Sequence, residues 1–348
     1  MGVGLVSVVV VGAGPSGLLA ASLLLDEGAS PIVVAAGEGS LGLWPGWLAA
    51  PRDDGAVERA VASLNRADAR LSSVDERDRL IGPLGVAHRF AWAPPELARV
   101  GPEDVVGFCG FAEMTETRAA VAVATWQSQT GSAAVGFDLA PWGRRVPFEL
   151  ARFLGHLEGA RALGRALAPR VDGAVSVVAV PGLLGIEDAT RALAVLEEML
   201  ERRVGEVPLV TPALAGWRLD RRVRTALAAR GATFRRARVV EVGRGGVRLA
   251  DGAHVDADAV VLATGGVAGG GIAIGPDGSL TDSARGVAIG DPAAWMMGED
   301  VGLLGYREVV VDEEARVVAV GALRAHEGSG FAQVAQSVTE AVEVLRSW

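Results

Sequence analysis

The sequence predicts an α/β protein in which a second α/β domain is inserted into a nucleotide-binding domain. A β-branched run near the amino terminus leads into a glycine-rich turn, and a second apolar strand with a glycine-rich end follows at 257–266. The segment between them, 46–205, has its own succession of predicted strands and helices. With 348 residues, half of them hydrophobic, the chain can bury the cores of two domains.

Composition and charge exclude several classes of function. The formal net charge of −9 argues against a general nucleic-acid binder, and the single cysteine, Cys109, excludes an internal disulfide and a four-thiolate iron–sulfur cluster. Glycines interrupt the apolar stretch 1–25, and polar residues interrupt 119–143, so we expect neither a signal peptide nor a membrane span. We expect a cytoplasmic protein without a metal site, peripheral to the inner face of the membrane only through partners.

The amino-terminal segment predicts a strand, a helix and a second parallel strand. Residues 6–11 form a continuous β-branched run, which is typical of a strand buried on both faces. A helix is expected over 18–27 before Gly28, and 31–35 predicts the second strand. The whole has the length of a βαβ unit, about 30 residues.

A G-x-G-x-x-G motif connects the first strand to the helix. It consists of Gly12, Ala13, Gly14, Pro15, Ser16 and Gly17. Gly12 permits a tight turn, Gly14 lets a pyrophosphate approach the backbone, and Gly17 lets the helix pack on the strand. The helix amino terminus offers unpaired N–H groups to the phosphate. The alternative is a glycine-rich turn without a ligand.

The end of the second strand lacks the acid that usually binds the adenosine ribose. Ala35 or Ala36 stands at that position, and Glu38 lies slightly beyond it. Glu38 either takes over the ribose contact or is a solvated loop residue. A cofactor without the adenosine half is therefore an alternative to a full dinucleotide.

A second signal comes from the segment 257–266, which ends in Thr264, Gly265 and Gly266. Two-domain flavoproteins of the glutathione-reductase type return the chain beside the first strand with such a sequence, and the glycines let the backbone pass the cofactor. The preceding segment 231–240 resembles the strand whose backbone lies near the adenine, which adds Val239 to the expected cofactor-binding residues. The alternative is a buried strand followed by a turn.

The remaining elements define the domain boundaries. In the inserted domain we expect helices at 57–70, 147–166 and 188–202 and strands at 104–109, 133–139 and 174–180. After Pro208 we expect a helix at 219–230 and strands at 233–242, 247–250 and 257–263. The cofactor domain is thus assigned to 1–45 and 206–348, and the inserted substrate or partner domain to 46–205.

The order of several short motifs resembles that of the B subunit of the anaerobic glycerol-3-phosphate dehydrogenase. The motifs are G-A-G-P-S-G, then 105–111, 148–154, 180–185, 212–219 and A-T-G-G-x-x-x-G-G from Ala263. The resemblance extends to about residue 275. It implies a glutathione-reductase-like fold and a flavin subunit, described as using FMN, which works with a catalytic FAD subunit and a membrane-bound iron–sulfur subunit. Residues 321–330 replace the family's longer G-G-x-D-P region.

Two residues of that replacement segment are the catalytic candidates. The imidazole of His326 could take a hydroxyl proton as hydride leaves for the flavin, and Arg324 could hold a phosphate or carboxylate. The alternative is a solvated loop histidine.

We therefore expect a flavoprotein subunit of a dehydrogenase complex. It would bind FAD, or alternatively FMN, and pass electrons from a small polyol phosphate or hydroxy acid to an iron–sulfur or quinone-linked partner. The apolar loop from Leu41 to Trp47 and the inserted domain are the expected partner surfaces. A stand-alone flavin oxidoreductase and a flavin-free structural subunit are the alternatives.

Overall fold

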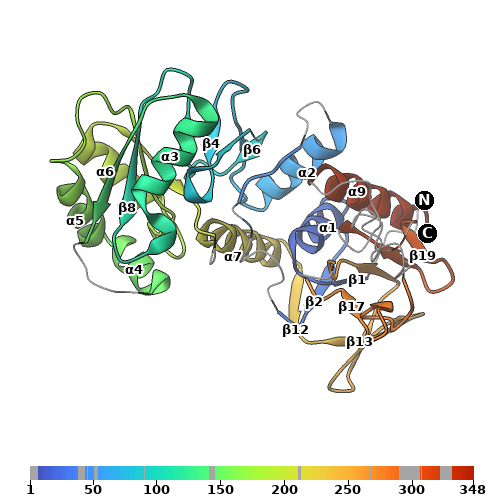
Figure 1. Ribbon diagram of the computed structural model, residues 1–348. Coiled ribbons are helices and arrows are strands. Elements are labelled where there is room, and N and C mark those ends of the chain that lie inside the picture. Colours follow the sequence, from blue (N-terminus) through green and yellow to red (C-terminus); the bar gives the residue numbers. More distant parts are fainter. Residues whose placement is uncertain are drawn as a thin grey trace. The chain divides into compact units, whose positions relative to one another are not determined.

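The computed structural model divides into two compact units (Figure 1). Unit 1 comprises Met1–Leu41, Ala50–Ala69 and Arg222–Trp348, and unit 2 comprises Gly42–Ala49 and Arg70–Arg221. The structure describes residues 7–37, 44, 46–50, 54–89, 91–140, 146–210, 213–266, 269–289, 306, 308–321 and 331–348. The boundaries differ from those expected at 45/46 and 205/206, because Ala50–Ala69 belongs to unit 1 and the second boundary falls inside a helix.

A six-stranded sheet forms the centre of unit 1, in the order β12-β2-β1-β16-β20-β19. Its strands are β1 (Val8–Val11), β2 (Pro31–Ala35), β12 (Thr233–Arg236), β16 (Ala259–Leu262), β19 (Val310–Asp312) and β20 (Val317–Ala319). All neighbours are parallel except β19 and β20. Val8 pairs with Pro31 on one side and with Ala259 on the other. The predicted return of the 257–263 segment beside the first strand is therefore confirmed.

The β-branched sequence of β1 suits this central position, since all four of its valines are buried. Three helices that contact one another belong to the same unit, namely α1 (Pro15–Asp26), α2 (Gly55–Arg66) and α9 (Phe331–Ser347) (Figure 1). A separate antiparallel sheet consists of β13 (Val239–Gly243), β14 (Gly246–Leu249) and β15 (His254–Asp256). The hairpin β17 (Ile272–Ile274) and β18 (Leu280–Asp282) completes the unit.

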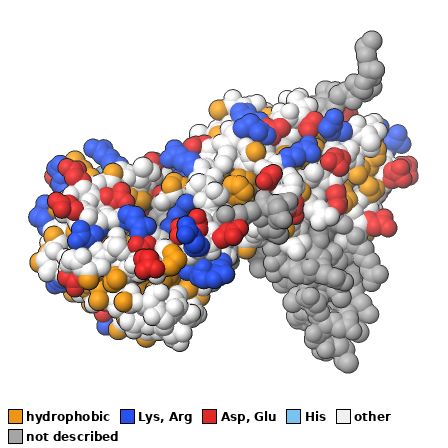
Figure 2. All heavy atoms as spheres, turned by 90° about the horizontal axis from the view of Figure 1, so that it is seen from above, with side chains coloured by type: hydrophobic (Ala, Val, Ile, Leu, Met, Phe, Trp, Pro, Cys, Tyr) orange, Lys and Arg blue, Asp and Glu red, His pale blue; other side chains and the backbone are white. Residues whose placement is uncertain are grey.

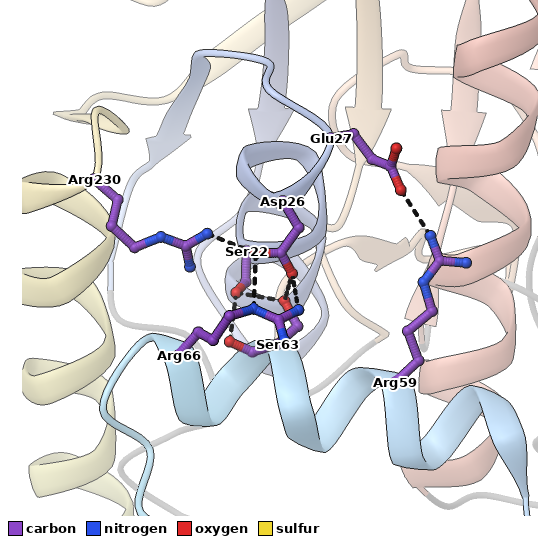
Figure 3. Close-up of polar contacts among 7 residues, drawn as sticks. All are labelled: Ser22, Asp26, Glu27, Arg59, Ser63, Arg66 and Arg230. Atoms are coloured by element: carbon purple, nitrogen blue, oxygen red, sulfur yellow. Dashed lines mark hydrogen bonds and ion pairs between the residues drawn. The ribbon is translucent and has the colours of Figure 1, made fainter.

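Polar side chains join α1 to α2 within unit 1 (Figure 3). The residues drawn are Ser22, Asp26, Glu27, Arg59, Ser63, Arg66 and Arg230. The hydroxyls of Ser22 and Ser63 lie 2.7 Å apart in the buried contact, and Ser63 also donates to Asp26. These contacts hold α2 against α1, and both helices belong to unit 1.

A four-stranded parallel sheet forms the centre of unit 2, in the order β11-β10-β8-β9. Its strands are β8 (Val106–Phe111), β9 (Ala134–Leu139), β10 (Val177–Pro181) and β11 (Arg203–Val207). Its helices are α3 (Ala119–Thr130), α4 (Pro147–Leu154), α5 (Leu157–Leu167), α6 (Thr190–Leu200) and the start of α7 (Leu214–Ala229). Shorter elements are β3 (Ser72–Ser73), β4 (Arg79–Ile81), η2 (Pro83–Gly85), β5 (Ala87–His88), β6 (Trp92–Ala93), β7 (Arg99–Val100) and η3 (Thr115–Thr117).

Two predicted elements are each divided in the structure. The helix expected over 147–166 is two helices, and the extended backbone of His156 separates them. A Cβ on Gly155 would lie 2.8 Å from the Cα of Gly185, so tertiary packing sets this break. The strand expected over 233–242 is also two strands, which join different sheets.

A buried ion pair lies in unit 2 between Arg218 of α7 and Glu206 of β11. The Arg218 guanidinium also donates to the carbonyl of Gly185 at 2.7 Å, and Glu206 accepts from the backbone N–H of Leu184 at 2.8 Å. The motifs 180–185 and 212–219 are therefore joined through this pair. Burial raises the pKa of Glu206, with an added contribution from Glu96, although Arg218 opposes both effects.

The described surface is mixed in charge. On the face drawn in Figure 2, arginine side chains lie among aspartate and glutamate side chains, with small hydrophobic areas between them. Within the described ranges, no helix combines the length and the apolar character needed to cross a membrane.

Candidate nucleotide-binding site

The glycine turn after β1 is closely packed at its two ends and open in the middle. Gly12 has a φ of +113°, and a Cβ there would lie 2.2 Å from the carbonyl oxygen of Ala263. A Cβ on Gly17 would lie 2.0 Å from the carbonyl oxygen of Gly12. At Gly14, by contrast, no atom of the described residues other than its chain neighbours lies within 4 Å of the Cβ position. Gly12 and Gly17 thus serve packing, whereas Gly14 leaves space for a ligand.

The amino terminus of α1 directly follows this turn. Gly14 is the N-cap residue, no side chain caps the helix, and its first turn carries no acid. Pro15 occupies the first turn, where a backbone N–H would have no helical partner. The first N–H groups and the positive end of the helix dipole are therefore available to an anion.

A pocket of about 740 Å³ lies within unit 1 at the carboxyl ends of four parallel strands. The strands are β1, β2, β12 and β16, and from β1 the sheet continues to β2 on one side and to β16 on the other. Ligands in open α/β sheets bind at such a switch point. The volume is in the range of cofactor and small-molecule sites, about 300–1,000 Å³.

Most of the expected cofactor-binding residues line this pocket. They are Gly12, Ala13, Gly14, Pro15, Ser16, Ala35, Val239, Thr264, Gly265 and Gly266. Gly17 is not among the lining residues, because it is buried against the carbonyl of Gly12. Glu38, Arg324 and His326 lie outside the described residues, so their predicted roles remain predictions.

The β2 end of the pocket is small and uncharged. Ala35, Ala36 and Gly37 line it, and no carboxylate side chain occurs among the described lining residues. Arg238, which follows β12, is the single charged residue in that described lining. Arg238 is not among the cofactor-binding residues predicted from the sequence, although it is the direct neighbour of Val239.

A further wall of the pocket comes from Ser283, Ala284 and Val334. Sequence reasoning missed all three, because no local motif marks them. Asp282 holds Ala284, because its carboxylate accepts from the N–H of Ala284 at 2.9 Å, and it also accepts from the Tyr306 hydroxyl at 2.7 Å. Burial, followed by the contact with Asp282, raises the pKa of Tyr306, so this hydroxyl remains protonated.

Thr264 supplies an unsatisfied polar group. Its hydroxyl is buried and has no hydrogen-bond partner within the described part of the chain. A Cβ on Gly271 would lie 2.6 Å from this oxygen, so the neighbouring backbone covers the hydroxyl and it does not face the open pocket. With free helix N–H groups and a space beside Gly14, the residues present fit the phosphate portion of a flavin nucleotide.

Other reactive side chains do not form a second centre. Burial raises the pKa of the Cys109 thiol, which makes it a poor nucleophile, and burial lowers the pKa of His88. Groups of three or more potential metal ligands are absent from the described residues.

Comparisons with known proteins give structural likenesses only. No family model and no curated protein matches the chain. The GidA-related protein from Thermus thermophilus is 12% identical, with 99% of each chain covered and a TM-score of 0.36. The tryptophan 5-halogenase MibH is 16% identical over 99% of this chain and 68% of its own, with a TM-score of 0.40. A 2-methyl-3-hydroxypyridine-5-carboxylic acid oxygenase is 10% identical over 98% and 82%, with a TM-score of 0.39.

The topology itself defines the class of protein. A parallel sheet in the order found here, a glycine turn that opens α1 and a second α/β unit together constitute a Rossmann-like, two-domain flavoprotein fold. The predicted fold class is therefore confirmed.

Proposed function

We propose that the pocket binds a flavin nucleotide, FAD in the first place, and that the protein is a flavin-dependent oxidoreductase. The observation that carries this proposal is the pocket at the sheet's switch point, where the open side of Gly14 and the residues Thr264–Gly266 face the same space. All described lining residues belong to unit 1.

Each part of the pocket has a distinct task in this proposal. The backbone N–H groups from Gly14 to Gly17 bind phosphate, and the backbone near Val239 lies beside the adenine. Thr264 and the following glycines, which line the pocket, hold the ribityl chain by close approach of their backbone. When bound, a flavin supplies hydride and electron transfer.

The finer proposal is a subunit of a dehydrogenase complex. Its substrate would be a small polyol phosphate or hydroxy acid, with Arg324 holding the anionic group and His326 taking the hydroxyl proton. The single cysteine of the chain supports the need for a partner, because a cluster relay requires about four thiolates. A second candidate is a stand-alone flavin oxidoreductase, in keeping with described lining residues that all belong to unit 1.

The absorbance spectrum of the purified protein tests the flavin proposal. We expect about one flavin per chain, released by heat and identified by mass spectrometry. Because Ala35 leaves the ribose without a carboxylate, we also expect FAD and FMN to bind with more similar affinities than in proteins that have the acid. A colourless protein that gains no flavin absorbance on reconstitution would contradict the proposal and leave the structural-subunit alternative.

A further inference from the structure

An arginine outside the glycine motif contacts the turn directly. Arg224, on α7, donates from Nη2 to the carbonyl oxygen of Ala13 at 3.0 Å. Its guanidinium carbon also lies 5.6 Å from the centre of the Phe234 ring on β12. Both contacts lie within unit 1, and Ala13 is one of the residues that line the pocket.

The hydrogen bond to Ala13 fixes the orientation of the next N–H group. A peptide bond is planar and trans, so the carbonyl of Ala13 and the N–H of Gly14 point in opposite directions. With the carbonyl directed to Arg224, the Gly14 N–H is directed away from it. Among the described residues, no backbone carbonyl accepts from this N–H. Arg224 therefore holds the turn in an orientation that leaves the Gly14 N–H available to a ligand.

The charge of Arg224 acts in the same direction. The described lining of the pocket contains no carboxylate, and the first turn of α1 contains none either. Arg224 is partly buried, so its charge is less screened than that of a fully solvated side chain. A phosphate at the turn would thus meet the helix dipole and a nearby guanidinium, without an opposing acid among those residues.

We propose that Arg224 is a positioning residue for a diphosphate-bearing ligand, acting through the Ala13 peptide and through its charge. The inference rests on the proposed function only in using the same pocket. Its ligand class is the pyrophosphate of a nucleotide, which ADP shares with FAD. Phe234 holds the guanidinium by a cation–π contact.

Binding of ADP and adenosine to the full chain, measured by calorimetry, separates this role from a purely structural one. In Arg224→Gln we expect about a tenfold loss of ADP affinity, since the charge-assisted hydrogen bond to the Ala13 carbonyl and the positive charge are both lost. Adenosine affinity should change little. Arg224→Lys should restore part of the loss. Arg235→Gln is the control, because Arg235 is a partly exposed arginine of the same strand as Phe234 and pairs with Asp251.

Three outcomes overturn the inference: equal ADP affinity in Arg224→Gln and wild type, equal loss for ADP and adenosine, or no ADP binding by the wild type. FAD binding is measured on the same samples. If the wild type binds ADP with the expected dependence on Arg224 but takes up no flavin, the flavin proposal fails and the inference stands. If it binds flavin but Arg224→Gln keeps its ADP affinity, the inference fails alone.

Discussion

The glycines of the turn have separate roles, and single substitutions can distinguish them. Gly14→Asp places a carboxylate in open space where we expect the phosphate. Two charges about 4 Å apart repel by about 4 kcal/mol at an effective dielectric constant of about 20, so flavin affinity should fall roughly a thousandfold. The thermal midpoint of the protein without flavin should stay close to that of the wild type.

Gly12→Ala is the matched contrast. Its Cβ would collide with the Ala263 carbonyl, and its φ of +113° is strained for any residue with a side chain. We expect a loss of about 2–4 kcal/mol in the free energy of unfolding. If Gly14→Asp unfolds the protein as Gly12→Ala does, the assignment of Gly14 to the ligand is wrong.

At Arg218 we predict a large effect on stability. Arg218→Met leaves Glu206 buried without its guanidinium, and breaking one partner of such a pair costs about 3–5 kcal/mol. The double variant Arg218→Met with Glu206→Gln should recover part of the loss. Denaturant titrations of the three proteins test this, and a loss below about 1 kcal/mol in the single variant would contradict it.

The pH dependence of Arg218→Met follows from the direction of the pKa shift. Because the pKa of Glu206 is raised in the folded protein, stability falls as the pH rises from the unfolded pKa through the folded one. In Arg218→Met the pKa of Glu206 should rise further, because the guanidinium that favours the charged carboxylate is gone. The stability difference between variant and wild type should therefore be smaller in acid than at neutral pH.

Among the elements, the contact between α1 and α2 depends on Asp26 (Figure 3). Burial alone would raise the pKa of this carboxyl, but hydrogen bonds from Arg66, Ser63 and Arg230 outweigh burial and lower it. The Asp26 carboxylate thus stabilises the fold at pH values above its pKa in the unfolded chain. This stabilisation is lost as the pH falls through its lower pKa in the folded protein. The carboxylate lies at the carboxyl end of α1, where the helix dipole disfavours it without these arginines.

Asp26→Asn tests this contact. We expect a loss of about 1–2 kcal/mol at neutral pH, allowing for screening of the half-exposed Arg66. The loss should shrink as the pH falls below about 4, the usual pKa of an aspartate in the unfolded chain, toward the lower pKa of Asp26 in the folded protein. Unfolding curves across that range measure it, with Asp256→Asn as the control, because the Asp256 side chain is 98% exposed. A loss that is independent of pH would point to packing rather than charge.

At the scale of the whole molecule, the need to reoxidise a reduced flavin predicts a partner protein that accepts its electrons. A flavin reduced by two electrons must be reoxidised, and one cysteine cannot hold a cluster relay. We expect a stable hetero-oligomer in which the isolated chain turns over poorly with quinone or viologen dyes and the complex turns over well. Co-purification and dye-linked assays test this, and full activity of the single chain would favour the stand-alone enzyme.

Local sequence was sufficient for the first βαβ unit. The range predicted for β2 agrees with the structure, and the glycine turn lies where the motif placed it. Both depend on contacts between neighbours in the chain: β-branched residues favour a buried strand, and glycines permit the turn. The absence of a ribose-binding acid could likewise be predicted, because the position of that acid is found by counting from the glycine motif and Ala35 stands there.

Only the tertiary structure decided the rest of the pocket. Arg224, Ser283 and Val334 reach the turn or the pocket from distant segments, and none lies in a recognisable motif. The break between α4 and α5 likewise depends on Gly155 packing against Gly185. The sequence by itself therefore determined the strand, turn and helix that carry the candidate phosphate site. Long-range packing decided which side chains surround that site, because those contacts form only when the sheet brings remote segments together.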